Sequence, residues 1–197
     1  MRKKPICFLD IETTGLDSVR HEIIEVSVIK EHPTGALEYY SAKIRPTRIE
    51  DADETALKIN RFHSRDWSDA FDGLYVAEEL SKFLHGCSVC AHNVRFDMEF
   101  LEEFFHQYSM PCRVDSRFLD TIMLAHEHLL VCGLTSLSLD SIRSFLGWSL
   151  ARNHTADKDA ADVRRLYHTL SRANFMRRFW WRMKNRIRQK LRNLTKK

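Results

Sequence analysis

The sequence predicts an α/β domain, a mixed sheet flanked by helices, followed by a basic amphipathic tail. Three observations predict this arrangement. The first 45 residues resemble strands joined by short turns, and from about residue 76 segments of helical periodicity alternate with short apolar runs. Residues 172–197 then hold eleven Lys or Arg and no Asp or Glu, which leaves 20 basic against 27 acidic side chains in residues 1–171. An acidic body therefore carries a basic tail.

The opening elements are expected to be strands. Pro5–Glu12 is an almost continuous apolar run, typical of a central strand that is covered on both faces. Glu22–Lys30 and Glu38–Arg45 are expected to form two further strands, separated by "HPTG", which favours a hairpin turn. Three strands with such short connections indicate an antiparallel meander.

The rest of the body is expected to alternate helix and strand. In chain order we expect a short helix near Glu54–Asn60, a helix over Val76–Leu84, a buried strand in "CSVCAH", an amphipathic helix over Phe96–Tyr108, a strand leading into a helix at "RFLDTIM", and helices over Thr135–Gly147 and Asp157–Ser171. The predicted sheet is therefore mixed, with an antiparallel meander plus parallel strands, and has helices on its faces.

The cysteines indicate a reducing compartment. Their number is odd, they are scattered through apolar segments, and the chain shows no evident secretory signal, because Asp10 and Glu12 interrupt the first apolar run. "CSVC" lies in a strand-like run without a second ligand pair, so we do not interpret it as a zinc or redox motif. No segment has the roughly 20 apolar residues that span a bilayer. We expect a cytoplasmic protein with reduced cysteines and no transmembrane segment.

Two acids stand at the end of the first expected strand, in "FLDIETTG". Strand side chains alternate between faces, so Asp10 and Glu12 project from the same face and can approach one hard cation such as Mg2+. Taken alone, such a pair is more often a pair of solvated strand-end charges. Glu25, in "IIEVS", is a similar acid on the neighbouring strand and shows how easily one is misread.

Further acids offer partners for this pair. Asp97, in "AHNVRFDMEFL", falls in the first turn of a helix, where the helix dipole alone explains a carboxylate. Asp159 shares a helical stripe with Val163, Leu166 and Leu170, so it points toward the core, where an unpaired acid is costly. A metal site shared with Asp10, Glu12 and Asp97 accounts for all four acids. His154 precedes Asp159 by five residues and, taken alone, is a surface-loop histidine.

Three motifs now stand in order: D-x-E-T-T-G, H-N-x-x-F-D and H-x4-D. They resemble the exonuclease motifs of the DEDDh branch of 3′-to-5′ exonucleases, the DnaQ-like group that includes the epsilon proofreading subunit of bacterial DNA polymerase III. The resemblance covers Pro5–Ser171 and leaves only the tail outside it. We therefore expect an exonuclease domain over residues 1–171 and a basic amphipathic helix over residues 172–197.

The resemblance implies a ribonuclease H-like fold and hydrolysis of the terminal phosphodiester to nucleoside 5′-monophosphates. It implies two divalent metal ions, Mg2+ or Mn2+, held by Asp10, Glu12, Asp97 and Asp159, and His154 as the general base. The implied substrate-binding residues are Thr13, Thr14, Gly15, Leu16, His92, Asn93 and Phe96. Ordinary core packing is the alternative explanation for Leu16 and Phe96.

The nature of the substrate is left open by these motifs. Related oligoribonucleases usually carry Met-Thr where this chain has Thr13-Thr14, which favours DNA, with single-stranded or frayed 3′ ends and a role in proofreading or DNA repair. The first alternative is a 3′-to-5′ exoribonuclease of the same family. The second is a catalytically weak adaptor that binds nucleic acid through its basic tail, but a binding module has no need for four acids crowded together.

The tail is expected to form a basic amphipathic helix. Its apolar residues recur every three or four positions, and they are Met176, Phe179, Met183, Ile187, Leu191 and Leu194. Such a helix suits a protein groove or the body itself, the phosphate backbone of nucleic acid, or an anionic membrane surface. The simplest interpretation is that it docks on the body by its apolar stripe.

Overall fold

The computed structural model describes residues 4–149 and 156–194, with side chains described up to residue 188. Contacts divide the chain into two compact units. Unit 1 comprises Met1–Asp120 and Asn153–Arg164, and unit 2 comprises Thr121–Arg152 and Arg165–Lys197. Each unit is described by itself. The expected boundary between residues 171 and 172 stays a prediction.

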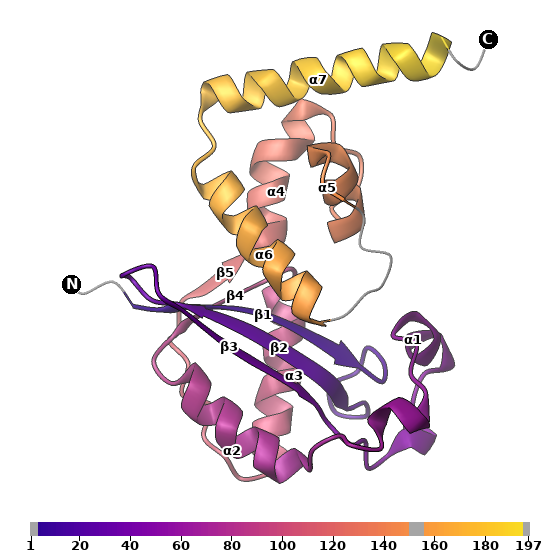
Figure 1. Ribbon diagram of the computed structural model, residues 1–197, viewed down its shortest axis with the longest axis vertical. Helices are drawn as coiled ribbons and strands as arrows, with labels where there is room; N and C mark the ends of the chain where they lie inside the picture. The colour runs from indigo at the N-terminus through magenta and orange to yellow at the C-terminus, as the bar shows by residue number, and fades with distance from the viewer. Residues whose placement is uncertain (1–3, 150–155, 195–197) are drawn as a thin grey trace. The chain divides into compact units, whose positions relative to one another are not determined.

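Unit 1 contains a five-stranded mixed sheet in the order β3-β2-β1-β4-β5. Its strands are β1 (Ile6–Thr13), β2 (Ile23–Glu31), β3 (Leu37–Lys43), β4 (Ser88–Ala91) and β5 (Phe118–Asp120). β1 pairs antiparallel with β2, and β2 with β3, whereas β4 runs parallel to both β1 and β5. The predicted meander with added parallel strands is confirmed (Figure 1).

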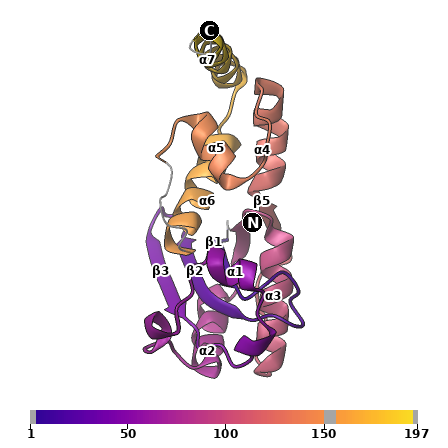
Figure 2. The same cartoon turned by 90° about the vertical axis from the view of Figure 1, so that its right-hand side faces the viewer.

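One face of this sheet is covered by two helices, α2 (Gly73–Leu84) and α3 (Val94–Gln107), which contact each other. α2 contacts β3, and α3 contacts β1, β4 and β5. Figure 2 shows the two helices and the sheet from the side. The core on this face takes alternate residues of β1, namely Cys7, Leu9 and Ile11. Because strand side chains alternate, Phe8, Asp10 and Glu12 face the other way.

The remaining elements of unit 1 are short, apart from the beginning of α6. They are η1 (Ile49–Asp51), α1 (Glu54–Ile59) and η2 (Ser64–Trp67), together with α6 (Ala156–Ser171) as far as Arg164. The side chain of Arg164 donates to Glu31 of β2, 2.7 Å from Nε to Oε2. Ala156, Ala160 and Val163 are fully buried, so the first turns of α6 cover the sheet face that bears Asp10.

Unit 2 is helical. It contains α4 (Thr121–Leu129), η3 (Leu130–Cys132), α5 (Leu139–Leu146), the end of α6 and α7 (Phe175–Leu194). Leu129, Ile142, Leu166 and Leu170 are fully buried in its core, and Trp181 of α7 joins them. None of the helices in the described residues is long and apolar enough to cross a membrane.

Two predicted helix starts were wrong. The helix expected from Val76 begins at Gly73, because the Asp72 carboxylate accepts from the N–H of Leu74 and caps it. The helix expected from Thr135 begins only at Leu139, because the Ser138 side chain accepts from the N–H of Ser141. Its end at Gly147, which adopts a φ of 76°, was predicted correctly.

The cysteines of the protein are free, as expected. Four are buried, and Cys112 is half-buried. The stripe of Asp159, Val163, Leu166 and Leu170 also faces inward as predicted, since none of the four side chains is more than 8% exposed.

Candidate active site

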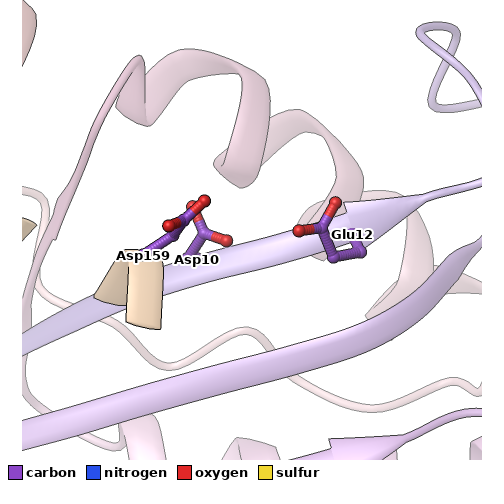
Figure 3. A group of neighbouring side chains, drawn as sticks. All are labelled: Asp10, Glu12 and Asp159. Atoms are coloured by element: carbon purple, nitrogen blue, oxygen red, sulfur yellow. The ribbon is translucent and has the colours of Figure 1, made fainter. Parts of the chain in front are cut away.

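Three carboxylates meet on the sheet face opposite α2 and α3. Asp10 and Glu12 come from β1 and Asp159 from the first turn of α6, and one oxygen of each lies within 4.8 Å of the others. Figure 3 shows Asp10 and Asp159 side by side with Glu12 further along β1, all three directed to the same side of the strand. The strand alternation of residues 10 and 12 and the helical stripe of Asp159 are therefore what bring the cluster together.

Asp97 lies near this acidic cluster but is not one of its three members. It occupies the first turn of α3, directly after β4, and only 4% of it is exposed. Burial raises its pKa well above the ordinary aspartate value, and the charges of Asp120 and Glu12 raise that pKa further. The fourth predicted ligand is thus within electrostatic range of Glu12.

The cluster crowds negative charge into a partly buried site. Burial first, and then the carboxylates of Asp159 and Glu25, raise the pKa of Glu12 from 4.5 to about 7. Glu25 lies directly opposite Glu12 in the β1–β2 ladder, and its own pKa is raised by burial and by Asp157. Like charges facing each other across a strand pair are destabilising unless something compensates them.

A divalent cation fits this donor set. Hard cations such as Mg2+ and Mn2+ take oxygen ligands, and carboxylates from one strand and one helix converge here with raised pKa at Glu12. Arg164, at the end of the α6 segment in unit 1, is paired with Glu31. A bound cation would hold the carboxylates ionised and relieve the repulsion between them.

The loop that follows β1 is held by hydrogen bonds at both ends of its turn. The Thr13 hydroxyl donates to the carbonyl of Gly15 at 2.6 Å, and Asn60 Nδ2 donates to the carbonyl of Thr13 at 2.8 Å. Thr14 forms two hydrogen bonds with the backbone of Glu22, since its N–H donates to the Glu22 carbonyl and its hydroxyl accepts from the Glu22 N–H. The β1–β2 register also shifts between Glu12 and Thr13.

Gly15 and Leu16 form the outer part of this loop. A side chain at Gly15 would come within 2.5 Å of the His21 ring, so the residue must be a glycine for His21 to stay where it is. Leu16 is 82% exposed. That exposure excludes core packing as the explanation for Leu16, although its contact with a substrate stays a prediction.

The predicted substrate-binding residues around α3 differ in their exposure to solvent. Asn93 is exposed and has a φ of 80°, and its N–H donates to Asp120 Oδ1 at 3.2 Å. Phe96 is half-buried with its ring centroid 4.8 Å from that of Phe100, so part of it does pack on the core. His92 is half-buried. His154 lies outside the described residues.

Two residues that contact this site were not predicted from the sequence. Asn60, at the end of α1, donates to the Thr13 carbonyl. Glu25 was not counted as a site residue, although it lies opposite Glu12 in the β1–β2 ladder. Glu25 could have been found from the meander if the register of its strands were known. The contact of Asn60 spans 47 positions and has no sequence signal.

Comparison with known proteins agrees with this geometry. A family model described as exonuclease, RNase_T, matches residues 7–167. The chain belongs to the RNase_T exonuclease family. This membership supports a nuclease function and confirms the resemblance to the DnaQ-like group.

Relatives of this exonuclease family include much longer proteins. The PolC-type DNA polymerase III of Thermotoga maritima is 32% identical over 152 residues, which cover 77% of this chain and 11% of the polymerase. The corresponding protein of Caldanaerobacter subterraneus is 28% identical over 162 residues, again 77% of this chain and 10% of the relative. The chain thus spans about a tenth of the length of these relatives.

Solved structures confirm the fold. E. coli Exonuclease I in complex with a dT13 oligonucleotide aligns with a TM-score of 0.72 at 17% identity, over 86% of this chain and 42% of that one. Exonuclease I from Methylocaldum szegediense aligns with a TM-score of 0.71 at 17% identity, over 85% of this chain and 41% of its own. The predicted ribonuclease H-like exonuclease fold is confirmed.

Proposed function

We propose that this protein is a metal-dependent 3′-to-5′ exonuclease that hydrolyses the terminal phosphodiester of DNA, at single-stranded or frayed 3′ ends, to nucleoside 5′-monophosphates. The observation that carries the proposal is the convergence of Asp10, Glu12 and Asp159 within 4.8 Å, in a chain of the exonuclease family. Two relatives named DNA polymerase III and a structural neighbour solved with dT13 favour DNA over RNA.

The carboxylates provide the binding groups of the proposed mechanism. Asp10, Glu12 and Asp159 would hold the divalent metal ions, Mg2+ or Mn2+, with Asp97 contributing from its buried position beside Glu12. When bound, two such ions stabilise both the entering and the leaving oxygen of an in-line displacement. The proposal needs Glu12 ionised, and because its pKa is raised in the metal-free chain, cation binding should strengthen as the pH rises toward neutral and basic values.

The loop after β1 would position the 3′ end. Its backbone from Thr13 to Gly15 is fixed by hydrogen bonds, so it can meet a terminal 3′-hydroxyl without reordering. Leu16 would press against the last base from its exposed position, and Phe96 would offer its exposed part for stacking. His92 and Asn93 would hydrogen-bond the nucleotide.

Two end-labelled strands test the polarity. A single-stranded DNA labelled at its 3′ end should release the label as a mononucleotide at once, and a strand labelled at its 5′ end should shorten step by step. Both reactions should need Mg2+ or Mn2+ and stop in EDTA. Release of a mononucleotide from the 5′ label first would contradict the polarity, and no release with either metal would favour the adaptor.

The same assay distinguishes substrates. We expect single-stranded DNA and duplex DNA with a mismatched 3′ end to be degraded faster than short RNA of the same sequence. Faster degradation of the RNA would identify an exoribonuclease instead. A matched duplex with a fully paired 3′ end is the control for the requirement of a frayed end.

We predict that His154→Ala lowers kcat by about 10²-fold or more, which is the usual contribution of a positioned general base. His154 would accept the proton that the attacking water loses, and alanine cannot. Single-turnover assays should show that the chemical step is slower, with little change in substrate affinity. His106→Ala, which removes an exposed histidine of α3, is the matched control, and equal activity of the two variants would rule out the role of His154.

A further inference from the structure

One exposed face of α7 is apolar. Met176, Phe179, Trp180, Met183 and Ile187 follow one another at helical spacing, and each is between 41% and 70% exposed. We name these five residues the α7 stripe. All but Trp180 belong to the apolar stripe expected from the sequence. Of the alternatives left open there, docking of that stripe on the body is not what these four exposed side chains show.

A different face of α7 attaches it to unit 2. Trp181 is buried in the core of that unit, and α7 contacts η3 and α4 (Figure 1). Asn185 Nδ2 donates to the carbonyls of Cys132 and Gly133, at 3.3 and 3.2 Å. Arg188 donates to the Phe145 carbonyl at 2.9 Å. These contacts fix the rotation of α7 about its axis and leave the stripe pointing to the opposite side.

Cations border the α7 stripe on both sides. Helical spacing places Arg182 and Arg186 along one edge and Arg177 and Lys184 along the other. The guanidinium groups of Arg182 and Arg177 donate to the carbonyls of Val131 and Thr169, respectively. Within the part of the chain that the structure describes, this leaves Arg186 and Lys184 as the cations of the two edges without such a hydrogen bond. Lys184 Nζ lies 4.7 Å from the centroid of the Trp180 ring, at the stripe's edge. The sequence from residue 172 to 197 contains no Asp or Glu, so nothing within this segment neutralises these charges.

We propose that the α7 stripe binds the surface of an anionic lipid bilayer, with the helix lying in the plane of the interface. An apolar stripe between two rows of cations matches such a surface, because the apolar side chains enter the acyl boundary while Arg and Lys reach the headgroups on either side. Trp180 at the edge suits the headgroup level. The proposal is independent of the nuclease reaction.

The charges disfavour the other occupants. A phosphate backbone would need cations along the centre of the surface, where the α7 stripe has apolar side chains. A second copy of α7 would bring two purely cationic helices together without acidic partners. A protein groove would have to offer acidic side chains on both sides of an apolar floor. An anionic bilayer offers anionic headgroups and an apolar interior at every point of its surface.

Vesicle flotation with the full chain tests this proposal. We expect the protein to float with vesicles of phosphatidylcholine and phosphatidylglycerol, not with phosphatidylcholine alone, and to dissociate as NaCl is raised. Phe179→Gln with Met183→Gln should weaken binding roughly tenfold or more, because both apolar groups are lost from the stripe. Arg186→Gln should weaken it about fivefold, since each surface cation adds a similar increment.

A matched double variant is available in the same chain. Phe118→Gln with Met123→Gln makes the same two changes at exposed positions of β5 and α4 and should bind anionic vesicles like the unaltered protein. Failure of the unaltered protein to float, or equal binding by the two double variants, would overturn the proposal. The proposal would also be overturned if the stripe variant bound vesicles like the unaltered protein but bound a dT oligonucleotide, measured in EDTA, much more weakly. Circular dichroism of each variant checks that it is folded.

Discussion

Asp159→Asn should reduce nuclease activity by about 10³-fold or more, while leaving the protein folded. Metal ions at such a site contribute several kcal/mol to the stabilisation of the transition state, and each 1.36 kcal/mol is a factor of ten in rate. Asparagine keeps the shape of the side chain but removes the charge with which Asp159 would bind a divalent cation. The measurement is mononucleotide release from a 3′-labelled strand at saturating Mg2+, with metal binding followed by calorimetry.

Asp157→Asn is the matched control. It makes the same change two residues earlier on α6, at a side chain that is exposed and lies outside the acidic cluster. We expect it to keep activity within a few fold of the unaltered protein, and Asp10→Ala to be as inactive as Asp159→Asn. Full activity in purified Asp159→Asn or Asp10→Ala would show that the cluster is not the catalytic site.

The different behaviour of Asp159 and Asp157 is also what the sequence could predict. Helical periodicity alone placed Asp159 on the buried stripe with Val163, and the structure leaves it 8% exposed while Asp157 is exposed. Strand alternation in the same way placed Asp10 and Glu12 on one face. These predictions succeed because each depends on one element with a fixed repeat.

Predictions that depend on contacts between elements were less complete. The register that sets Glu25 opposite Glu12, and the support that Asn60 gives to the Thr13 carbonyl, arise from how strands and helices meet. Local periodicity contains no information about either. Asp97 was placed correctly in the first turn of α3, but that it is not one of the three clustered carboxylates could not be read from the periodicity of one helix.

Which face of α7 packs on the rest of unit 2 also depends on contacts between elements. The simplest interpretation made the most regular apolar stripe of this helix the docking face, yet Trp181, which lies outside that stripe, is buried and Met183 is 41% exposed. One large aromatic side chain, aided by polar side chains that reach the carbonyls of η3, fixes the face that docks. The number of apolar residues on a face therefore did not predict which face is covered.

The second large effect is expected from Glu12→Gln, which should inactivate the enzyme and yet stabilise the metal-free protein at basic pH. Burial and the neighbouring carboxylates raise the pKa of Glu12 to about 7 in the folded chain, from 4.5. Between about pH 4.5 and pH 7, Glu12 has lost its proton in the unfolded chain and retains it in the folded chain. Folding therefore becomes less favourable as the pH rises. The penalty is complete above about pH 7 and absent below about pH 4.5.

Thermal unfolding in EDTA measures this effect. At about pH 8, Glu12→Gln should raise the free energy of unfolding by about 1 to 3 kcal/mol, and at about pH 4 the two proteins should differ little. Mg2+ at about pH 8 should stabilise the unaltered protein, because it binds only the folded state, and should stabilise the variant much less. Glu78→Gln, at an exposed position of α2, is the control.

The outcome separates two explanations for the acidic cluster. If the carboxylates were kept for stability, Glu12→Gln would lower the free energy of unfolding at every pH. A gain in stability together with a loss of activity would instead mean that the like charges of Glu12, Asp159 and Glu25 are a cost borne by the fold for cation binding. A variant that is less stable at about pH 8 in EDTA would refute that interpretation.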